Sequence, residues 1–166
     1  MRHKFSSIFP VFFLFFLFLN MCSVATAVTV NYTSAVGDWT TIDDKTGQAL
    51  SIVKIYQNTD KGTLEGKVIQ INPVLGQKVD DRCQACDGNT KNQPILGMQI
   101  LWDMQQDKDD MTVWNNGRVL DPKSGSIYRA KMTLINNGCQ LSLRGYVMVT
   151  WLGRSEVWQR ANSECK

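Results

Sequence analysis

The sequence predicts an all-β protein, and the strongest evidence is a long hairpin near its C-terminus. Apolar and polar residues alternate over 128–134 and again over 141–151, which is the period of a half-buried strand. Asn137-Gly138 lies between the two runs and is a preferred pair for a two-residue type I′ turn, because both turn positions need positive φ. That turn sets Leu134 opposite Leu141 and brings both apolar sets onto one face of the sheet.

The rest of the chain contains further short strands separated by turns. Turn signals rich in Gly, Asp and Asn follow several of the apolar runs, and no stretch has the period of a helix. Successive strands joined by short turns favour an up-and-down antiparallel sheet. Closing it into a single β-barrel of about eight strands removes the exposed edges. Besides the hairpin, the expected strands are 37–42, 52–56, 64–71, 96–102, 112–120 and 155–160.

Residues 1–27 have the features of a secretory signal peptide. A basic start at 2–4 precedes an apolar run over 8–19, and Ala25-Thr26-Ala27 provides a small-residue cleavage site. The apolar run is too short to span a bilayer, so no transmembrane segment is expected in the mature chain. Lipidation at Cys22 is the alternative, although large residues precede that cysteine. The sequence predicts a periplasmic or secreted protein whose single domain covers 28–166.

The composition of that domain excludes several functional classes. The only His and all seven Phe lie within residues 1–27. Without histidine, a Ser-His-Asp or Cys-His nucleophilic system and a His-ligated metal site are excluded. Acidic and basic residues nearly balance once Arg2 and Lys4 are removed, which gives no electrostatic footprint for nucleic acid. No cofactor, metal or catalytic residue is therefore expected.

Four cysteines remain in the exported domain, and an even number favours disulfides. Cys83-x-x-Cys86 lies in a long irregular segment, so a local disulfide explains it better than a thioredoxin-type motif, which requires a following helix. A zinc site would need two more cysteines from distant strands. The chain returns antiparallel after Gly153, which brings Cys165 back to the end of the sheet that holds Cys139. The expected bridges are Cys83–Cys86 and Cys139–Cys165.

Two groups of carboxylates have a functional and a structural interpretation. A cluster of aspartates could bind calcium, but it lacks the alternation of a known loop motif and contains a lysine, so a solvated hairpin tip is preferred. Asp121 and Glu156 could form an acid–base pair, but turn chemistry and an outward strand position account for them. The aspartates of the cluster are Asp103, Asp107, Asp109 and Asp110.

Small residues and tryptophans bear on whether the barrel has an open interior. Small residues recur where inward faces are expected; they mark bends or leave room for a ligand, and both interpretations stay open. Because the domain lacks Phe, most tryptophans must serve in the core. Trp102 and Trp114 are the better candidates for a pocket. The small residues are Gly66, Gly97, Ala130 and Gly145.

The order of motifs along the chain resembles a known family. Gly37-x-Trp39, with an arginine near the last strand, resembles the lipocalin closure. A co-linear set of motifs covers nearly the whole domain: Trp39, Cys83-x-x-Cys86, Pro94, Gly97, Trp114, Gly117, Asp121-Pro122, Ser124-Gly125, Tyr128, Arg144-Gly145-Tyr146, Leu152-Gly153-Arg154-Ser155, Trp158 and Arg160. This set resembles the exported bacterial proteins grouped as domain of unknown function 2147. The resemblance implies a lipocalin-like barrel closed by Trp39 packed on Arg160, or less favourably Arg154.

The expected function is binding of a small apolar or amphipathic ligand in the lumen of the barrel, without catalysis. The alternative is a structural or partner-binding envelope protein whose barrel is filled by side chains. An open, apolar lumen would favour the first, whereas a packed lumen with an exposed apolar patch would favour the second. The expected ligand-binding residues are Val53, Ile55, Met98, Ile100, Trp102, Trp114, Tyr128, Met132 and Leu143.

Overall fold

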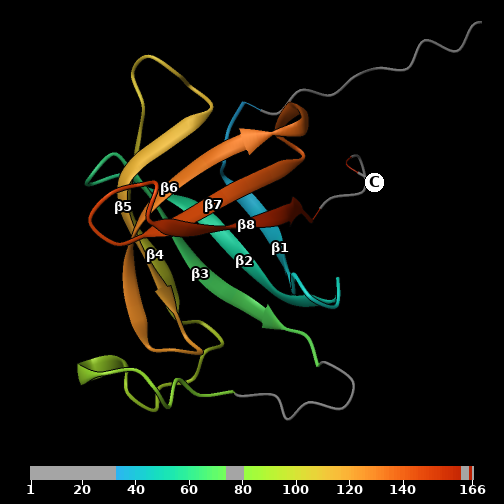
Figure 1. The fold of residues 1–166 in the computed structure, drawn as a ribbon, viewed down its shortest axis with the longest axis vertical. Helices are drawn as coiled ribbons and strands as arrows, with labels where there is room; N and C mark the ends of the chain where they lie inside the picture. Colours follow the sequence, from blue (N-terminus) through green and yellow to red (C-terminus); the bar gives the residue numbers. More distant parts are fainter. Residues whose placement is uncertain (1–32, 74–80, 162–164, 166) are drawn as a thin grey trace, which may run out of the picture.

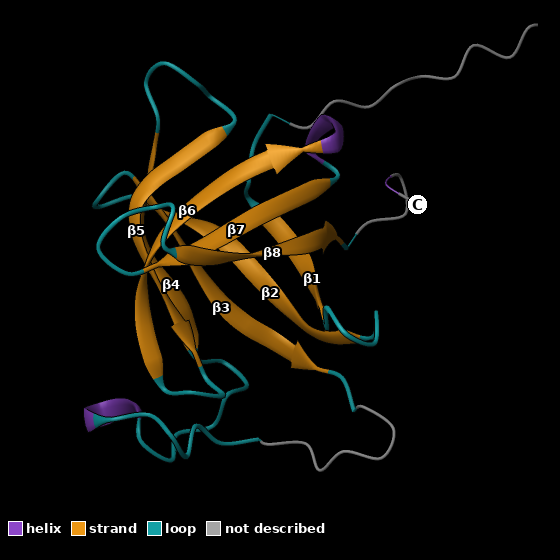
Figure 2. Ribbon diagram, in the orientation of Figure 1, coloured by secondary structure: helices purple, strands orange, loops and turns teal. Residues whose placement is uncertain are grey.

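Eight antiparallel strands form one closed barrel in the computed structural model, which describes residues 33–73, 81–161 and 165 (Figure 1). Each strand pairs with the next one along the chain, and β8 closes on β1. The only described helices are single 3₁₀ turns, η1 (Gly88–Thr90) and η2 (Asn136–Gly138) (Figure 2). The strands are β1 (Gly37–Ile42), β2 (Ala49–Asn58), β3 (Thr63–Ile71), β4 (Gln99–Gln106), β5 (Val113–Asp121), β6 (Ser126–Ile135), β7 (Gln140–Tyr146) and β8 (Gly153–Arg160). The predicted fold class is confirmed; residues 1–27, the predicted signal peptide, lie outside the described part.

The predicted register of the C-terminal hairpin is confirmed. Leu134 pairs with Leu141 and Ala130 with Gly145, so the apolar sets of β6 and β7 share the inner face. The turn is wider than a two-residue loop, because Asn136 joins Asn137 and Gly138 at positive φ. The prediction that β7 runs on to residue 151 is wrong. The strand ends at Tyr146, and residues 147–152 form a loop.

Strand β4 departs from the simple alternation predicted for residues 96–102. Its pairing with β3 shifts register twice, and Asp103 takes a positive φ of 59°. Leu101 and Met104 point inward, whereas Trp102 lies on the outer face, where the guanidinium of Arg118 is 6.0 Å from its ring centroid. The register shifts are β-bulges, which change the face of the sheet to which the following side chains point. The period of the sequence alone does not reveal a bulge.

The barrel has two different ends. At the closed end lie segment 33–36 and the β2–β3, β4–β5 and β6–β7 connections. At the open end lie the β1–β2 turn, loop 81–98, the β5–β6 turn and loop 147–152. The core fills the closed half with large, fully buried side chains, which include Trp39, Ile55, Leu101, Met104, Met132 and Leu141.

Two inward glycines have their space filled by side chains of a neighbouring strand. A Cβ on Gly66 would lie 2.9 Å from Leu101 Cδ1, and one on Gly117 would overlap the sulfur of Met104. At these positions small residues permit close packing and leave no cavity. Gly97 is not inward as predicted: it adopts a φ of 85° in the turn before β4, with nothing within 4 Å of a Cβ built there.

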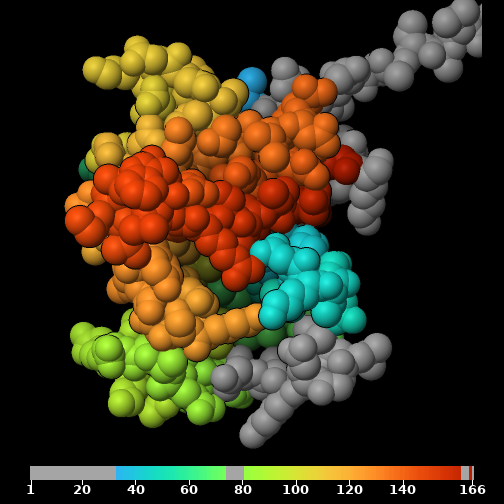
Figure 3. Space-filling view, in the orientation of Figure 1, coloured from blue at the N-terminus to red at the C-terminus, as the bar shows by residue number. Residues whose placement is uncertain are grey.

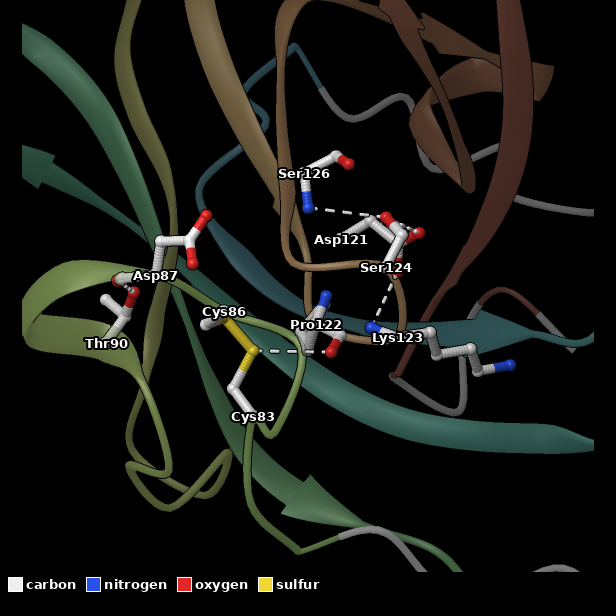
Figure 4. Close-up of a disulfide and its surroundings, with 9 residues drawn as sticks. All are labelled: Cys83, Cys86, Asp87, Thr90, Asp121, Pro122, Lys123, Ser124 and Ser126. Atoms are coloured by element: carbon white, nitrogen blue, oxygen red, sulfur yellow. Dashed lines mark hydrogen bonds between the residues drawn. A yellow bond between two sulfur atoms is a disulfide. The ribbon is translucent and has the colours of Figure 1, made fainter.

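The Cys83–Cys86 disulfide lies within loop 81–98, next to the β5–β6 turn (Figure 4). Both cysteines are buried, and the sulfur of Cys83 lies 3.3 Å from the carbonyl oxygen of Pro122. A Cβ on Gly125 would overlap the carbonyl of Ala85, so the two loops fit tightly together. The predicted Cys83–Cys86 disulfide is present, and only the single 3₁₀ turn η1 follows it, not the longer helix of a thioredoxin-type motif.

The second predicted disulfide is also present. Cys139 and Cys165 are bonded, with their Cα atoms 5.3 Å apart. Cys139 follows the β6–β7 turn, and its carbonyl accepts a hydrogen bond from the backbone N–H of Arg160. The bridge therefore ties the chain beyond β8 to the closed end of the barrel.

Candidate functional site

The predicted closure of the barrel by Trp39 and Arg160 is confirmed. The two residues pair across β1 and β8, and the Arg160 guanidinium lies 4.2 Å from the centroid of the Trp39 ring. Trp39 Nε1 donates to the carbonyl of Ala35 over 2.9 Å. Arg160 donates to the carbonyls of Ser34 at 2.8 Å and Gly138 at 2.8 Å. These contacts hold segment 33–36 across the closed end.

The seam between β1 and β8 is joined only near the closed end. Among the described residues, Trp39 pairs with Arg160 and Thr40 with Gln159, and no β1 partner is found for β8 from Gly153 to Trp158. In Figure 3, green atoms of the interior are visible between the cyan β1–β2 turn, the red atoms of β8 and the orange β5–β6 turn. The barrel is therefore open to solvent on this side.

One ion pair crosses the open part of the seam. Arg154 of β8 donates to Asp44 in the β1–β2 turn. This hydrogen bond and the negative charges of Asp44, Glu156 and Asp121 raise the pKa of the Arg154 guanidinium above its ordinary value. Asp121 and Glu156 therefore share the surroundings of one arginine. Asp121 also accepts hydrogen bonds from Lys123 N and Ser124 Oγ, which is turn chemistry.

The inner wall at the open end can take an added methyl group at Gly145. Val119 pairs with Tyr128, and both lie beside Gly145 on the inner face. A Cβ on Gly145 would be 3.5 Å or more from any neighbour, so this position has room that Gly66 and Gly117 lack. Glu156 pairs with the inward Leu143 and is nevertheless exposed. Solvent therefore reaches inward-facing positions here.

Trp158 lies on the same wall, between the open and the closed end. It pairs with the inward Leu141 and is 3% exposed. Its Nε1 atom is buried without a hydrogen-bond partner in the described part of the structure. A buried donor that lacks an acceptor is costly, so such groups commonly mark sites where a ligand or an ordered water binds.

The predicted ligand-binding residues do not all meet in the lumen. The six from β2, β5, β6 and β7 face the interior: Val53, Ile55, Trp114, Tyr128, Met132 and Leu143. Met98 and Trp102 lie instead beside an outer groove of about 490 Å³ that Pro94 and Leu96 also line. Ile100 is buried in β4 between them. A second cavity, of about 200 Å³, lies at the closed end and is lined partly by Trp114 and Met104.

Side chains on the outer face form a polar network across β2 to β5. Glu65 is largely buried there and accepts hydrogen bonds from Asn58 Nδ2 at 2.7 Å and Gln99 Nε2 at 3.0 Å. Burial, followed by the charge of Glu65, raises the pKa of Tyr56. Lys61 Nζ lies 3.8 Å from Glu65 and 2.9 Å from Asp103. These contacts link neighbouring strands, so Glu65 and Asp103 stabilise the sheet.

The aspartates near the β4–β5 loop serve local structure. Asp107 accepts the backbone N–H groups of Asp109 and Asp110, and Asp110 accepts that of Thr112. Hydrogen bonds from Thr112 lower the pKa of Asp110. Within the described ranges, no group of three or more His, Cys, Asp or Glu could hold a metal ion. The described residues also contain no helix long and apolar enough to cross a membrane.

Sequence reasoning missed Glu156 and Trp158 as residues of the lumen. The charge of Glu156 favours an outward strand position, and the absence of Phe from the exported domain favours a general core role for Trp158. A signal was present: every second residue from 154 to 160 lies on the same face of a strand, so the inward Arg160 places Arg154, Glu156 and Trp158 on the inner face as well.

The comparisons with known proteins agree with this architecture. The model of the family described as "Uncharacterized protein conserved in bacteria (DUF2147)" matches residues 37–160. No curated protein matches this chain. A solved structure described as protein HP1028 from Helicobacter pylori, of the lipocalin family, is similar with a TM-score of 0.62 and 18% identity. The match covers 83% of this chain and 86% of that one. The protein is therefore a member of the DUF2147 family with a lipocalin-like fold.

Proposed function

We propose that this protein binds a small apolar or amphipathic ligand in the open half of its barrel, without catalysing a reaction on it. The observation that carries the proposal is the inward position Glu156, which is exposed to solvent although it pairs with the inward Leu143. A Cβ at the neighbouring Gly145 would meet Tyr128 and Val119 only at contact distance, whereas one at Gly66 or Gly117 would overlap a side chain. An eight-stranded barrel has room for side chains or for one small ligand. The largest fully buried side chains lie in the closed half, so the proposed site lies in the other half, where the inward Glu156 is exposed.

The lining of this wall determines which ligands it fits. Val119, Leu143 and the ring of Tyr128 provide apolar surface, while Glu156 and the Thr41–Ser51 hydroxyl pair lie at the open end. The apolar part of a ligand would cover the apolar side chains, and its polar group would remain near the opening. This distribution suits an amphipathic molecule.

Trp158 adds one specific requirement. Its Nε1–H is a buried donor without an acceptor among the described residues. A ligand with a carbonyl, ether or hydroxyl oxygen at that depth would satisfy it, and the free energy gained is that of removing an unpaired buried group. The preferred ligand is therefore apolar with one hydrogen-bond acceptor on its buried part.

The proposal also includes that the protein is exported and that it is not an enzyme. Two disulfides are compatible with an exported protein, as is a family conserved in bacteria. The similar solved structure is described as a lipocalin, a fold that typically binds ligands without converting them. The periplasm or the exterior of the cell is the proposed location.

Titration with fluorescent probes tests the proposal. N-phenyl-1-naphthylamine is apolar, and Prodan is a similar naphthalene that carries a carbonyl acceptor. We expect saturable binding of both, and Gly145→Leu should abolish it by filling the wall. Trp158→Phe keeps the ring and removes the donor, so it should weaken Prodan binding about 3- to 10-fold, with little effect on the other probe. Absence of saturable binding by the folded wild-type protein would refute the proposal.

The alternative function, a partner-binding envelope protein with a filled barrel, has one observation in its favour. The closed half of the barrel is packed, and large apolar side chains are exposed elsewhere, notably Met148 and Trp151. If neither probe binds but a protein partner is retained through those residues, this alternative replaces the first.

A further inference from the structure

Loop 147–152 exposes an unusual amount of apolar surface. Trp151 is 78% and Met148 76% exposed, and the neighbouring aliphatic residues are also exposed. Isolated exposed apolar residues are normal, but a contiguous group of this kind marks an interaction surface. The sequence pattern placed these residues in a strand with half of them buried; the structure ends the strand at Tyr146 and exposes them. The exposed aliphatic residues of the loop are Val147, Val149 and Leu152.

The loop is held in one conformation by hydrogen bonds. Arg144 projects from the outer face of β7 and donates to the carbonyls of Thr150 and Trp151, and its Nη1 donates to Ser155 Oγ at 2.9 Å. Met148 takes a positive φ of 65°, which a non-glycine residue rarely adopts. The loop therefore folds back over the outer face of the barrel with its apolar side chains fixed toward solvent.

Basic residues lie on the same outer face, and two cross-strand pairs join like charges. Arg118 of β5 pairs with Arg129 of β6, and Lys131 of β6 pairs with Arg144 of β7. Like charges opposite one another destabilise a sheet. In the described part of the chain, only Arg118 of these four has a carboxylate within ion-pair distance, at Asp103. No outward-facing residue of β6, β7 or β8 is acidic.

We propose that loop 147–152 and the basic row Arg129, Lys131 and Arg144 together form a docking surface for an anionic lipid bilayer. Tryptophan and methionine would enter the headgroup and upper acyl region, where an amphipathic ring is most stable. The basic row would lie against the negative surface, where each cation strengthens binding about fivefold. A bilayer explains both features at once, because its apolar layer lies directly beneath a layer of negative charge.

A bilayer also fits the position of this surface in the fold. Loop 147–152 lies at the open end of the barrel, beside the strand β8 whose inner wall carries Glu156 and Trp158. Docking would therefore place the opening near the membrane. The docking surface itself does not depend on whether the lumen binds a ligand, because its basic row lies on the outer face of β6 and β7 and the lumen is lined by their inner face.

Vesicle flotation tests the proposal with full-length mature protein. Phosphatidylcholine vesicles are compared with vesicles in which about one-third of the lipid is phosphatidylglycerol. We expect binding to the anionic vesicles at least about tenfold stronger than to the neutral ones, weakened by added salt. Trp151 is the most exposed tryptophan described, so its emission should shift to shorter wavelength on binding.

Matched variants separate the two contributions. Met148→Ser with Trp151→Ser should lower binding at least about tenfold. Met111→Ser should not, although this methionine at the closed end is also well exposed, at 61%. Arg129→Gln with Lys131→Gln should lower binding to anionic vesicles only.

Lys45→Gln with Lys91→Gln removes the same net charge from turns outside the docking surface and should have a smaller effect. No binding by wild type, or equal loss in the control variants, would overturn the proposal. So would a wild-type dimer that the Met148 and Trp151 changes dissociate, because the patch would then be covered by a second copy.

Discussion

The guanidinium of Arg160 lies over the ring of Trp39, 4.2 Å from its centroid, at the only place where the first and last strands pair in the described structure. The same guanidinium donates to three backbone carbonyls, those of Ser34, Val36 and Gly138. One side chain therefore joins the barrel seam, the N-terminal segment and the β6–β7 turn.

Replacing Arg160 should therefore destabilise the fold more than replacing an exposed arginine. Arg160→Ala removes the cation–π contact and leaves the buried carbonyl of Gly138 without its donor, so we expect a loss of about 2–4 kcal/mol in the free energy of unfolding. Arg160→Lys keeps the charge but cannot make the same planar set of bonds, and should recover only part of this loss. Urea unfolding measures both; an alanine variant as stable as wild type would show that closure does not depend on this residue.

The inward glycines give a direct test of which half of the barrel is filled. Gly66→Ala and Gly117→Ala should each cost about 1–3 kcal/mol, because the added methyl overlaps Leu101 or Met104. Gly145→Ala should be neutral or stabilise by up to about 1 kcal/mol, because its Cβ has room and alanine lowers the entropy of the unfolded chain. Thermal unfolding of the three variants decides it. A Gly145→Ala variant as unstable as the others would mean that the wall is filled.

The two disulfides should contribute unequally to stability. Cys139–Cys165 closes a loop with a sequence separation of 26, against 3 for Cys83–Cys86. Replacing the longer bridge by a pair of serines should cost about 3 kcal/mol in the chain-entropy model, and the free C-terminus should become sensitive to carboxypeptidase. Removing the shorter bridge should mainly loosen loop 81–98. Equal sensitivity of both variants to the enzyme would contradict this assignment.

Stability should fall with pH as Asp103 becomes protonated. Hydrogen bonds from Lys61 and then Arg118 lower the pKa of Asp103 below its ordinary value. Because the folded-state pKa is the lower one, the stabilisation is present at neutral pH and is lost as pH falls through that pKa. Asp103→Asn keeps a residue that tolerates positive φ and removes the charge. Its thermal midpoint should lie below that of wild type at neutral pH and converge with it in acid; a constant difference would exclude the ion pairs as its source.

The fold was predictable because periodicity and turn chemistry agree over most of the chain. The alternation about Asn137-Gly138 determined the register of β6 and β7, and the antiparallel return after Gly153 correctly paired Cys139 with Cys165. Alternation failed where the backbone bulges, as at Asp103, and where a strand stops early, as at Tyr146. The alternation of apolar and polar residues shows neither the bulge at Asp103 nor the end of β7 at Tyr146.

The candidate site was less predictable, because it depends on how side chains from different strands fill one volume. Gly66 and Gly145 look alike in the sequence, yet a Cβ at the first would lie 2.9 Å from Leu101 Cδ1, whereas one at the second would lie 3.5 Å from its nearest neighbour, Tyr128 Cβ. The unpaired donor of Trp158 depends in the same way on where neighbouring acceptors lie. Inter-strand packing of this kind has no periodic signal.

The most direct test of ligand binding in the lumen is a proton–nitrogen correlation spectrum of labelled protein titrated with Prodan. The account predicts saturable shifts of the Trp158 indole N–H and the Gly145 amide, while the Trp39 indole N–H, already bonded to the carbonyl of Ala35, stays unchanged. Shifts confined to the outer groove beside Trp102 or to loop 147–152, with the Trp158 and Gly145 signals unmoved, would contradict it.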